Sequence, residues 1–230
     1  MKAAAFVCAA PLVIALAGCS DPKAATKSNF ENAIQSWIGK NPPCLTVPSS
    51  PLRAAAGEPD GGFPRYVDAR PAAHPARVEA QAKEAAPFEA LAQSGLLSAS
   101  DTEIEVRAGF FGDGTAKVPV KAYQLTEKGK AAVSMDGQKT AFSVPSPQFC
   151  YGVPTIDEIV QFTEPGEMMG VKVSQVAYRY HLKDLPDWAK NAAMQSAFPQ
   201  LKKNVADSLE GKTAVVLTND GWVHERAAKL

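Results

Sequence analysis

The longest strand signal in this chain is VKVSQVAYRYHL, residues 171–182. Apolar and polar side chains alternate along it, with one slip in phase near Ser174, which is typical of a strand with one buried face. A hairpin follows nearer the C-terminus, where Asn219-Asp220-Gly221 gives a strong turn signal. The second half of the chain is therefore expected to form an antiparallel sheet, whose other strand candidates are residues 141–144, 148–151, 155–163, 213–218 and 222–225.

Helices are expected before and within this β-rich half. Ser28, followed by Glu31, has the spacing of a capping box. A helical insert is expected near residues 188–209, between the long strand and the hairpin. Apolar side chains after Ser28 recur with the helical period at Phe30, Ala33, Ile34, Trp37 and Ile38.

Residues 48–75 are rich in Pro, Ala and Gly, which predicts a long loop without a regular core element. The loop is followed by an Ala/Glu/Lys-rich stretch, Arg77–Ala86, which is expected to be helical. Pro87 is expected to begin a second helix, because proline suits the first position of a helix.

Residues 1–18 have the organisation of an export signal. Lys2 precedes an apolar run that is shorter than the roughly 20 residues a membrane-spanning helix needs. Leu16-Ala17-Gly18-Cys19 follows at once and resembles the lipobox of bacterial lipoproteins. The resemblance implies transfer of diacylglycerol to Cys19, cleavage before it, and acylation of the new amino group. A secretory signal with an accidental cysteine is the alternative.

An anchor at Cys19 would place the mature chain outside the cytoplasm. Each buried CH₂ contributes roughly 0.8 kcal/mol and a single acyl chain binds only marginally, so several chains on one cysteine give stable attachment. Ser20 stands where an Asp would resemble the inner-membrane retention signal. We therefore expect a lipid-anchored protein of the cell envelope, in the outer membrane facing the periplasm. Residues 19–27 would be its lipidated tether and residues 28–230 a single α+β globular body.

Two cysteines, Cys44 and Cys150, remain once Cys8 leaves with the signal and Cys19 takes lipid. In an oxidising compartment the simplest arrangement is one disulfide between them. Two buried free thiols are the alternative. Neither residue has a CxxC neighbour or a histidine close in sequence, which argues against a thiol-redox or zinc role.

The middle segment, residues 87–135, carries a second resemblance. Gly95-Leu96-Leu97 precedes an alternating strand, a glycine turn (Gly112-Asp113-Gly114) and a return strand, and Tyr123-Gln124-Leu125-Thr126-Glu127-Lys128-Gly129-Lys130 follows. This order resembles the wing and following helix of winged-helix domains. The expected fold class is therefore α+β, with an N-terminal helix, a winged-helix-like middle unit, and a C-terminal antiparallel sheet with packed helices.

Winged-helix proteins typically bind DNA, but no nucleic-acid partner is expected here. Residues 87–100 contain no Lys or Arg for phosphate contacts. An exported chain also does not meet the chromosome. The full chain has 24 basic and 24 acidic side chains, and removal of residues 1–18 takes away only Lys2 among them, leaving one net negative charge. No global field would therefore attract nucleic acid or an anionic membrane.

Motifs for catalysis are absent from the sequence. No two of His74, His181 and His224 have the H-x₃-H spacing of zincins, and no G-x-S-x-G nucleophile elbow is present. The carboxylates Asp157-Glu158 would point to opposite faces of a strand, so they are expected to be solvated surface groups rather than a glycosidase pair. We predict no catalytic, cofactor-binding or metal-ligating residues.

Three functions remain open at this point. The leading one is a non-enzymatic binding or structural lipoprotein whose partner is an envelope protein, a glycan or a small ligand. A periplasmic hydrolase without a local motif is the first alternative, and it requires His181 or His224 beside an acid and a nucleophile in a pocket. An immunity or self-protection lipoprotein is the second. Met168-Met169 is expected either to fill a gap beneath the sheet, which we favour, or to form an adaptable contact surface.

Overall fold

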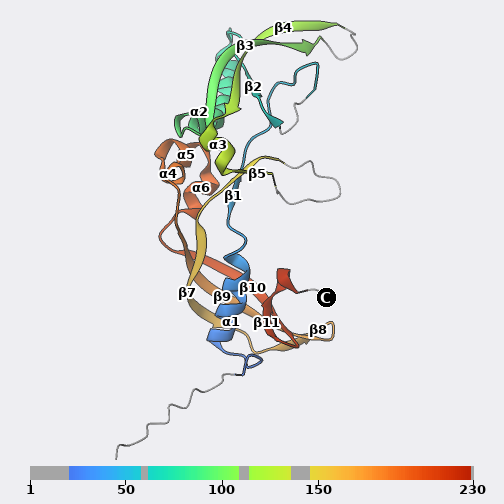
Figure 1. Cartoon of the computed structure of the whole chain (residues 1–230), viewed down its shortest axis with the longest axis vertical. Coiled ribbons are helices and arrows are strands. Elements are labelled where there is room, and N and C mark those ends of the chain that lie inside the picture. Colours follow the sequence, from blue (N-terminus) through green and yellow to red (C-terminus); the bar gives the residue numbers. More distant parts are fainter. Residues whose placement is uncertain (1–20, 58–61, 109–113, 136–145, 229–230) are drawn as a thin grey trace, which may run out of the picture.

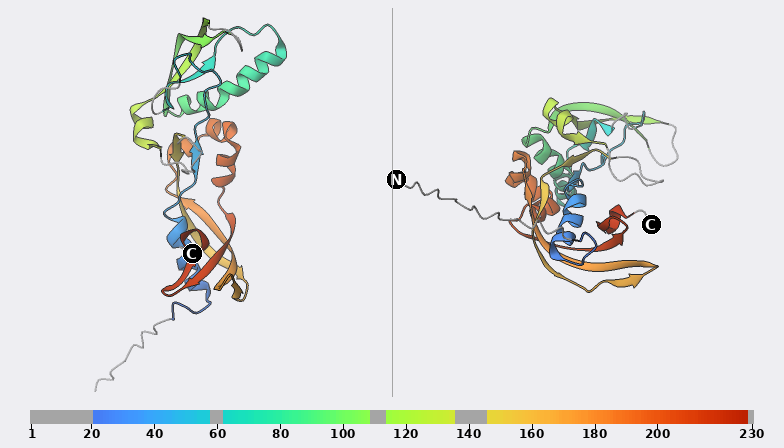
Figure 2. Two further views of the ribbon diagram at one scale, coloured as in Figure 1. Left: turned by 90° about the vertical axis from the view of Figure 1, so that its right-hand side faces the viewer. Right: turned by 60° about the horizontal axis from the view of Figure 1, so that its bottom comes forward.

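Three antiparallel sheets follow one another along an elongated α+β body in the computed structural model of this protein (Figures 1 and 2). The structure describes residues 21–57, 62–108, 114–135 and 146–228. The predicted export signal, Cys19, the strand candidate 141–144 and part of the predicted glycine turn lie outside these residues. The mixture of helices and sheets confirms the predicted α+β class.

The sheet at one end of the body, together with the first helix, is here called the basal unit. Helix α1 (Lys27–Ile38) packs across this sheet, in contact with its strands from both edges (Figure 1). The strand order is β11-β10-β9-β7, and a short strand, β8, extends the β7 side of β9. The strands are β7 (Val153–Phe162), β8 (Gly166–Met168), β9 (Val171–Lys183), β10 (Leu209–Thr218) and β11 (Gly221–His224).

The slip in phase predicted near Ser174 is not a break in strand β9. Its even-numbered side chains from Ser174 onward face the core, while Val171 and Val173 lie on the other face. Ser174 occupies a fully buried position because its hydroxyl donates a hydrogen bond to the backbone oxygen of Thr163 at 2.6 Å. A hydroxyl that makes a hydrogen bond can be buried. Buried and exposed side chains therefore alternate without a break along β9, and the apparent slip arises because a polar residue occupies one buried position.

The core of the basal unit is aromatic and lies between α1 and the sheet. Phe30 is fully buried and packs edge-on against Phe162 and Trp222, with ring centroids 4.8 and 4.9 Å apart respectively. Ile34, Ile159 and Val215 belong to the same buried cluster. The apolar stripe predicted for the first helix is therefore the stripe that the sheet covers.

The start of the first helix differs from the prediction. Thr26 rather than Ser28 is the N-cap, and its hydroxyl accepts a hydrogen bond from the backbone N–H of Asn29. The predicted tether also ends earlier than expected. The indole N–H of Trp222 donates to the backbone oxygens of Lys23 and Ala24 at 3.0 and 3.1 Å, so the chain already lies against the body there.

The opposite end of the body, here called the distal unit, contains a sheet of order β2-β4-β3 beside a long helix. Two predictions are corrected there. Strand β2, with Val67 buried, lies inside the segment predicted to be a loop, and one continuous helix runs through Pro87 instead of breaking there. The resemblance of this region to winged-helix domains stays a prediction. The elements are β2 (Arg65–Asp68), α2 (Pro75–Gln93), β3 (Leu97–Arg107), β4 (Thr115–Leu125) and α3 (Glu127–Ala132).

A third sheet, here called the waist, lies between the two units and has the order β1-β6-β5. Its strands are β1 (Cys44–Thr46), β5 (Val133–Ser134) and β6 (Gln148–Cys150). Cys44 and Cys150 are directly opposite each other in β1 and β6 and form the predicted disulfide. Phe149 beside them is fully buried and packs against Trp188, which belongs to the predicted helical insert. That insert consists of α4 (Asp187–Lys190), α5 (Ala192–Ala197) and α6 (Pro199–Asn204), and a 3₁₀ turn (Glu225–Ala227) follows β11.

Candidate functional site

His181 lies on the outer surface of the basal sheet, next to an acid. Its Nδ1 is 2.7 Å from Oδ1 of Asp157, and Arg179 pairs with Glu158 one step along the same two strands. A bulge in β7 between Ile156 and Glu158 turns both acids to the exposed side. They were expected on opposite faces, so that expectation is wrong, but each acid has a basic partner on β9. The arrangement is a pair of cross-strand contacts on the surface.

His224 has a different environment, since only 4% of it is exposed. Its Nδ1 accepts the backbone N–H of Arg226 at 3.1 Å, so the ring proton belongs on Nε2. Nε2 lies 3.0 Å from the hydroxyl oxygen of Thr213, and that hydroxyl donates to Glu225 at 2.9 Å. Two hydrogen bonds therefore run in sequence: the imidazole N–H of His224 donates to the Thr213 hydroxyl, and this hydroxyl donates to the Glu225 carboxylate.

This trio of hydroxyl, imidazole and acid is not arranged as a hydrolase triad. In a triad the imidazole stands between the acid and the nucleophile and takes the proton of the nucleophile. Here Thr213 stands in the middle, and the nitrogen that faces it already carries a proton. Thr213 is also buried. The network satisfies buried polar groups where β10 meets β11, which is a structural role.

The same network sets a pH dependence of stability. Burial lowers the pKa of His224 below its ordinary value of about 6.5, with Glu225 opposing the shift and Arg226 adding to it. The unfolded chain then binds the proton more readily, so the contribution of His224 to stability is present above about pH 6.5 and is lost as the pH falls below it. Denaturant unfolding over a pH series should show a steeper acid loss for the native chain than for His224→Gln. Parallel curves would contradict this assignment.

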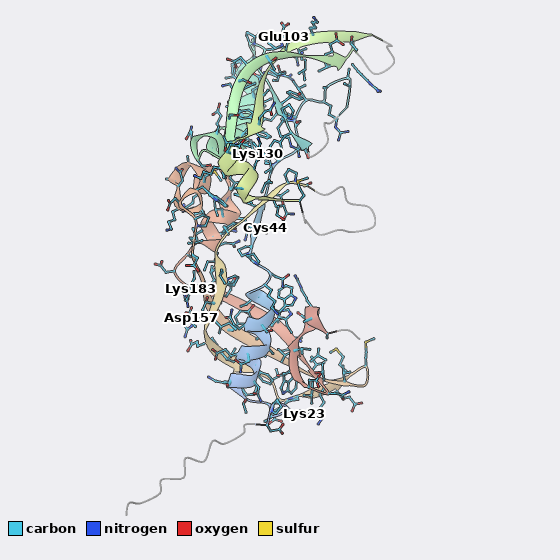
Figure 3. The ribbon with its side chains drawn as sticks, viewed as in Figure 1. Lys23, Cys44, Glu103, Lys130, Asp157 and Lys183 are labelled. Atoms are coloured by element: carbon cyan, nitrogen blue, oxygen red, sulfur yellow. A yellow bond between two sulfur atoms is a disulfide. The ribbon has the colours of Figure 1, made fainter. Side chains whose placement is uncertain are left out.

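A groove opens around Trp37 where the basal unit meets the waist. Three cavities, of about 440, 760 and 260 Å³, share Trp37 and Asn41 in their walls, and the largest is also lined by the disulfide between Cys44 and Cys150. Figure 3 shows Cys44 at this level, between the labelled Lys130 and Asp157. We call this surface the Trp37 groove and define it by Trp37, Lys40, Asn41 and Arg226.

The four residues that define the Trp37 groove carry two positive charges and no negative charge, while Asp220 lines the cavity of about 440 Å³. Lys40 and Arg226 are both exposed, and neither forms an ion pair with any residue that the structure describes. The guanidinium of Arg226 lies 5.4 Å from the Trp37 ring centroid, and the His224 ring stacks on the same indole at 4.3 Å. A cation over an aromatic ring is held in place while its N–H groups stay available to a ligand. The groove can therefore receive carboxylate or other anionic groups.

Met168 and Met169, which the sequence offered as a possible contact surface, do not line the Trp37 groove. Met168 is 59% exposed and Met169 99% exposed, so the favoured expectation that they fill a gap beneath the sheet is wrong. Trp188 and Trp222 are buried core residues. The sequence placed Trp37 in a core stripe and gave no signal for Arg226, because the pattern around residue 226 does not show which surface it meets.

Comparison with protein-family models, curated proteins and solved structures finds no match for this chain. Among the residues that the structure describes, no helix is both long and apolar enough to cross a membrane. In the same ranges, no group of three or more His, Cys, Asp or Glu side chains could hold a metal ion.

Proposed function

We propose that this chain is a lipid-anchored lipoprotein of the cell envelope that binds an acidic partner through the Trp37 groove and has no catalytic role. The observation that carries the proposal is the pair of exposed cations, Lys40 and Arg226, which have no ion-pair partner among the described residues and lie in a groove built on an indole. The lipobox at residues 16–19 supports the location, with Cys19 as the site of lipidation.

The environments of His181 and His224 support binding over hydrolysis. His181 contacts Asp157 on the surface, and its described side-chain hydrogen bonds include none to a hydroxyl group, although Thr155 lies opposite it on β7. His224 faces Thr213 with a protonated nitrogen, so it is not the general base that a hydrolase needs. The groove beside His224 offers donors and positive charge, which recognise a ligand without changing it.

A charge reversal inside the groove tests this proposal. The variant Lys40→Glu/Arg226→Glu replaces both cations with anions at exposed positions, so the fold should persist. In pull-downs from solubilised envelopes, the partner retained by the native lipidated protein should fall about tenfold or more, since juxtaposed like charges cost several kcal/mol. Mass spectrometry of the mature N-terminus on the same sample tests acylation of Cys19.

The matched control is Lys83→Glu/Lys117→Glu, which makes the same change in net charge at exposed positions of the distal unit. It should retain the partner at the native level. Equal losses in both variants would show a non-specific charge effect and would count against the groove. An unmodified and uncut N-terminus would count against the anchor.

A further inference from the structure

We infer that the turn between β8 and β9, Met168-Met169-Gly170, inserts into the surface of the same bilayer that holds the lipid anchor. The inference rests on the proposed lipidation of Cys19 and adds a second, non-covalent membrane contact beside it. The occupant of this apolar tip is a phospholipid surface.

The tip is the most exposed apolar feature of the described chain. Met169 is 99% exposed and Met168 59%, and they are adjacent in sequence. Apart from the glycine itself and its two chain neighbours, no described atom lies within 4 Å of a Cβ built on Gly166 or Gly170, so the turn projects freely from the body. Methionine is flexible and polarisable, which suits contact with a disordered apolar medium.

The backbone conformation at Met169 is one that methionine rarely adopts. Met168 pairs with Val171, so Met169 and Gly170 are the two central residues of the hairpin, with φ of 51° and 80°. Turns with both central residues in the left-handed region favour Asn-Gly or Asp-Gly, because a Cβ is disfavoured there. Folding alone would therefore select a small polar residue at position 169. A strained and fully exposed methionine is better explained by a contact outside the protein.

The path of the chain brings this end of the body to the membrane. Trp222 holds the backbone of Lys23 and Ala24, and Asp21 is the first described residue. Cys19 precedes Asp21 by two residues, which span at most about 7 Å when extended. An acylated Cys19 would therefore hold the basal unit directly against the lipid surface.

The sheet registers place the tip at that same end. Val173 of β9 pairs with Gly166 on one side and with Val216 on the other, close to the β10–β11 turn. Gly221 of that turn lies against Pro22, since a Cβ built on it would be 3.0 Å from the Pro22 backbone oxygen. Figure 1 shows β8 and β11 at the end where the described chain begins, and Figure 3 labels Lys23 there.

Charges beside the tip are compatible with a phospholipid surface. Glu167 lies directly opposite Lys172 in the β8–β9 pair, so the acid nearest to the methionines faces a base. Lys23 and Lys27 are exposed at the same end of the body and suit lipid phosphate groups, while the exposed acids Asp21 and Asp220 balance them, so the contact proposed for the tip is apolar rather than electrostatic.

Quenching by brominated lipid tests the contact. The lipidated Met168→Trp protein is reconstituted into vesicles of phosphatidylethanolamine and phosphatidylglycerol with and without brominated acyl chains. The emission added by the new indole should shift to the blue and be lost in brominated vesicles, because an interfacial side chain enters the acyl boundary. Val78→Trp, at an exposed apolar position of α2 in the distal unit, should add emission that brominated lipid does not quench.

An insertion separates the tip from the anchor. A flexible Gly/Ser segment of about ten residues after Ser20 keeps the lipid but lowers the effective concentration of the tip at the membrane, so quenching should decrease. Unchanged quenching would overturn the role assigned to the short connection. Acylated protein without quenching at position 168 would overturn the membrane contact while the anchor stands. A blue shift without quenching would overturn the membrane contact and assign the tip to a second copy of this chain, and an unacylated N-terminus would overturn both proposals.

Discussion

Replacing both waist cysteines, as Cys44→Ser/Cys150→Ser, is expected to lower the free energy of unfolding by roughly 4 kcal/mol. The disulfide joins positions 106 residues apart, and cross-linking a loop of about 100 residues stabilises by up to about 4.7 kcal/mol in the chain-entropy account. The loop closed by the disulfide contains the whole distal unit. Loss of the disulfide therefore increases the conformational entropy of the unfolded chain and so favours unfolding. Urea or guanidinium unfolding in oxidising buffer measures the difference.

The control for this prediction is the native protein with a reductant. Reduction removes the same cross-link without changing the side chains, so native and variant proteins should then unfold at nearly the same denaturant concentration. A difference that persists after reduction would mean that the serine substitutions act through local packing. Equal stability of the two proteins before reduction would contradict the prediction.

Sequence patterns predicted the basal unit well because its elements have one buried face each. The stripe at Phe30 and Ile34 and the alternation along β9 both reflect a single apolar surface, which periodicity reads directly. Strand β2 was missed because its four residues lie between prolines and glycines, where local pattern favours a loop. Its pairing with β4 supplies the partner that the local sequence cannot show.

The Trp37 groove was harder to predict from the sequence, because its contacts also join segments that are far apart in the chain. Trp37 was assigned to the helix stripe, and its second contact, with His224, joins residues that are far apart in the chain. Arg226 lies in a short turn without periodicity, so nothing local indicates that it covers an indole. The disulfide was predicted because only two cysteines remained, which made the pairing a matter of counting rather than of geometry.

The middle segment shows how a motif can be explained by packing. Thr126 caps α3 by accepting the backbone N–H of Gly129, while its own hydroxyl donates to the backbone oxygen of Gly95 at 2.7 Å. Its backbone N–H also donates to Leu96. These contacts fasten α3 to the segment before β3 and give Gly95, Thr126 and Gly129 of this pattern a structural role.

Gly129→Ala is therefore expected to destabilise the distal unit by about 3 kcal/mol, at the upper end of the usual cost of overpacking. A Cβ built on Gly129 would overlap the backbone oxygen of Leu96, and a backbone atom cannot rotate away as a flexible side chain can. Chemical denaturation of the native chain and the variant measures the loss.

Gly166→Ala is the matched control, since a Cβ there meets no atom within 4 Å and the backbone is not left-handed. Its effect should stay within about 0.5 kcal/mol, as for other surface substitutions. If both variants lost the same stability, the close approach of α3 to Leu96 would be absent, and with it the structural explanation of the motif. A large loss of stability in Gly129→Ala alone would show that packing requires this glycine. Packing would then be enough to explain a glycine at this position of the winged-helix-like motif.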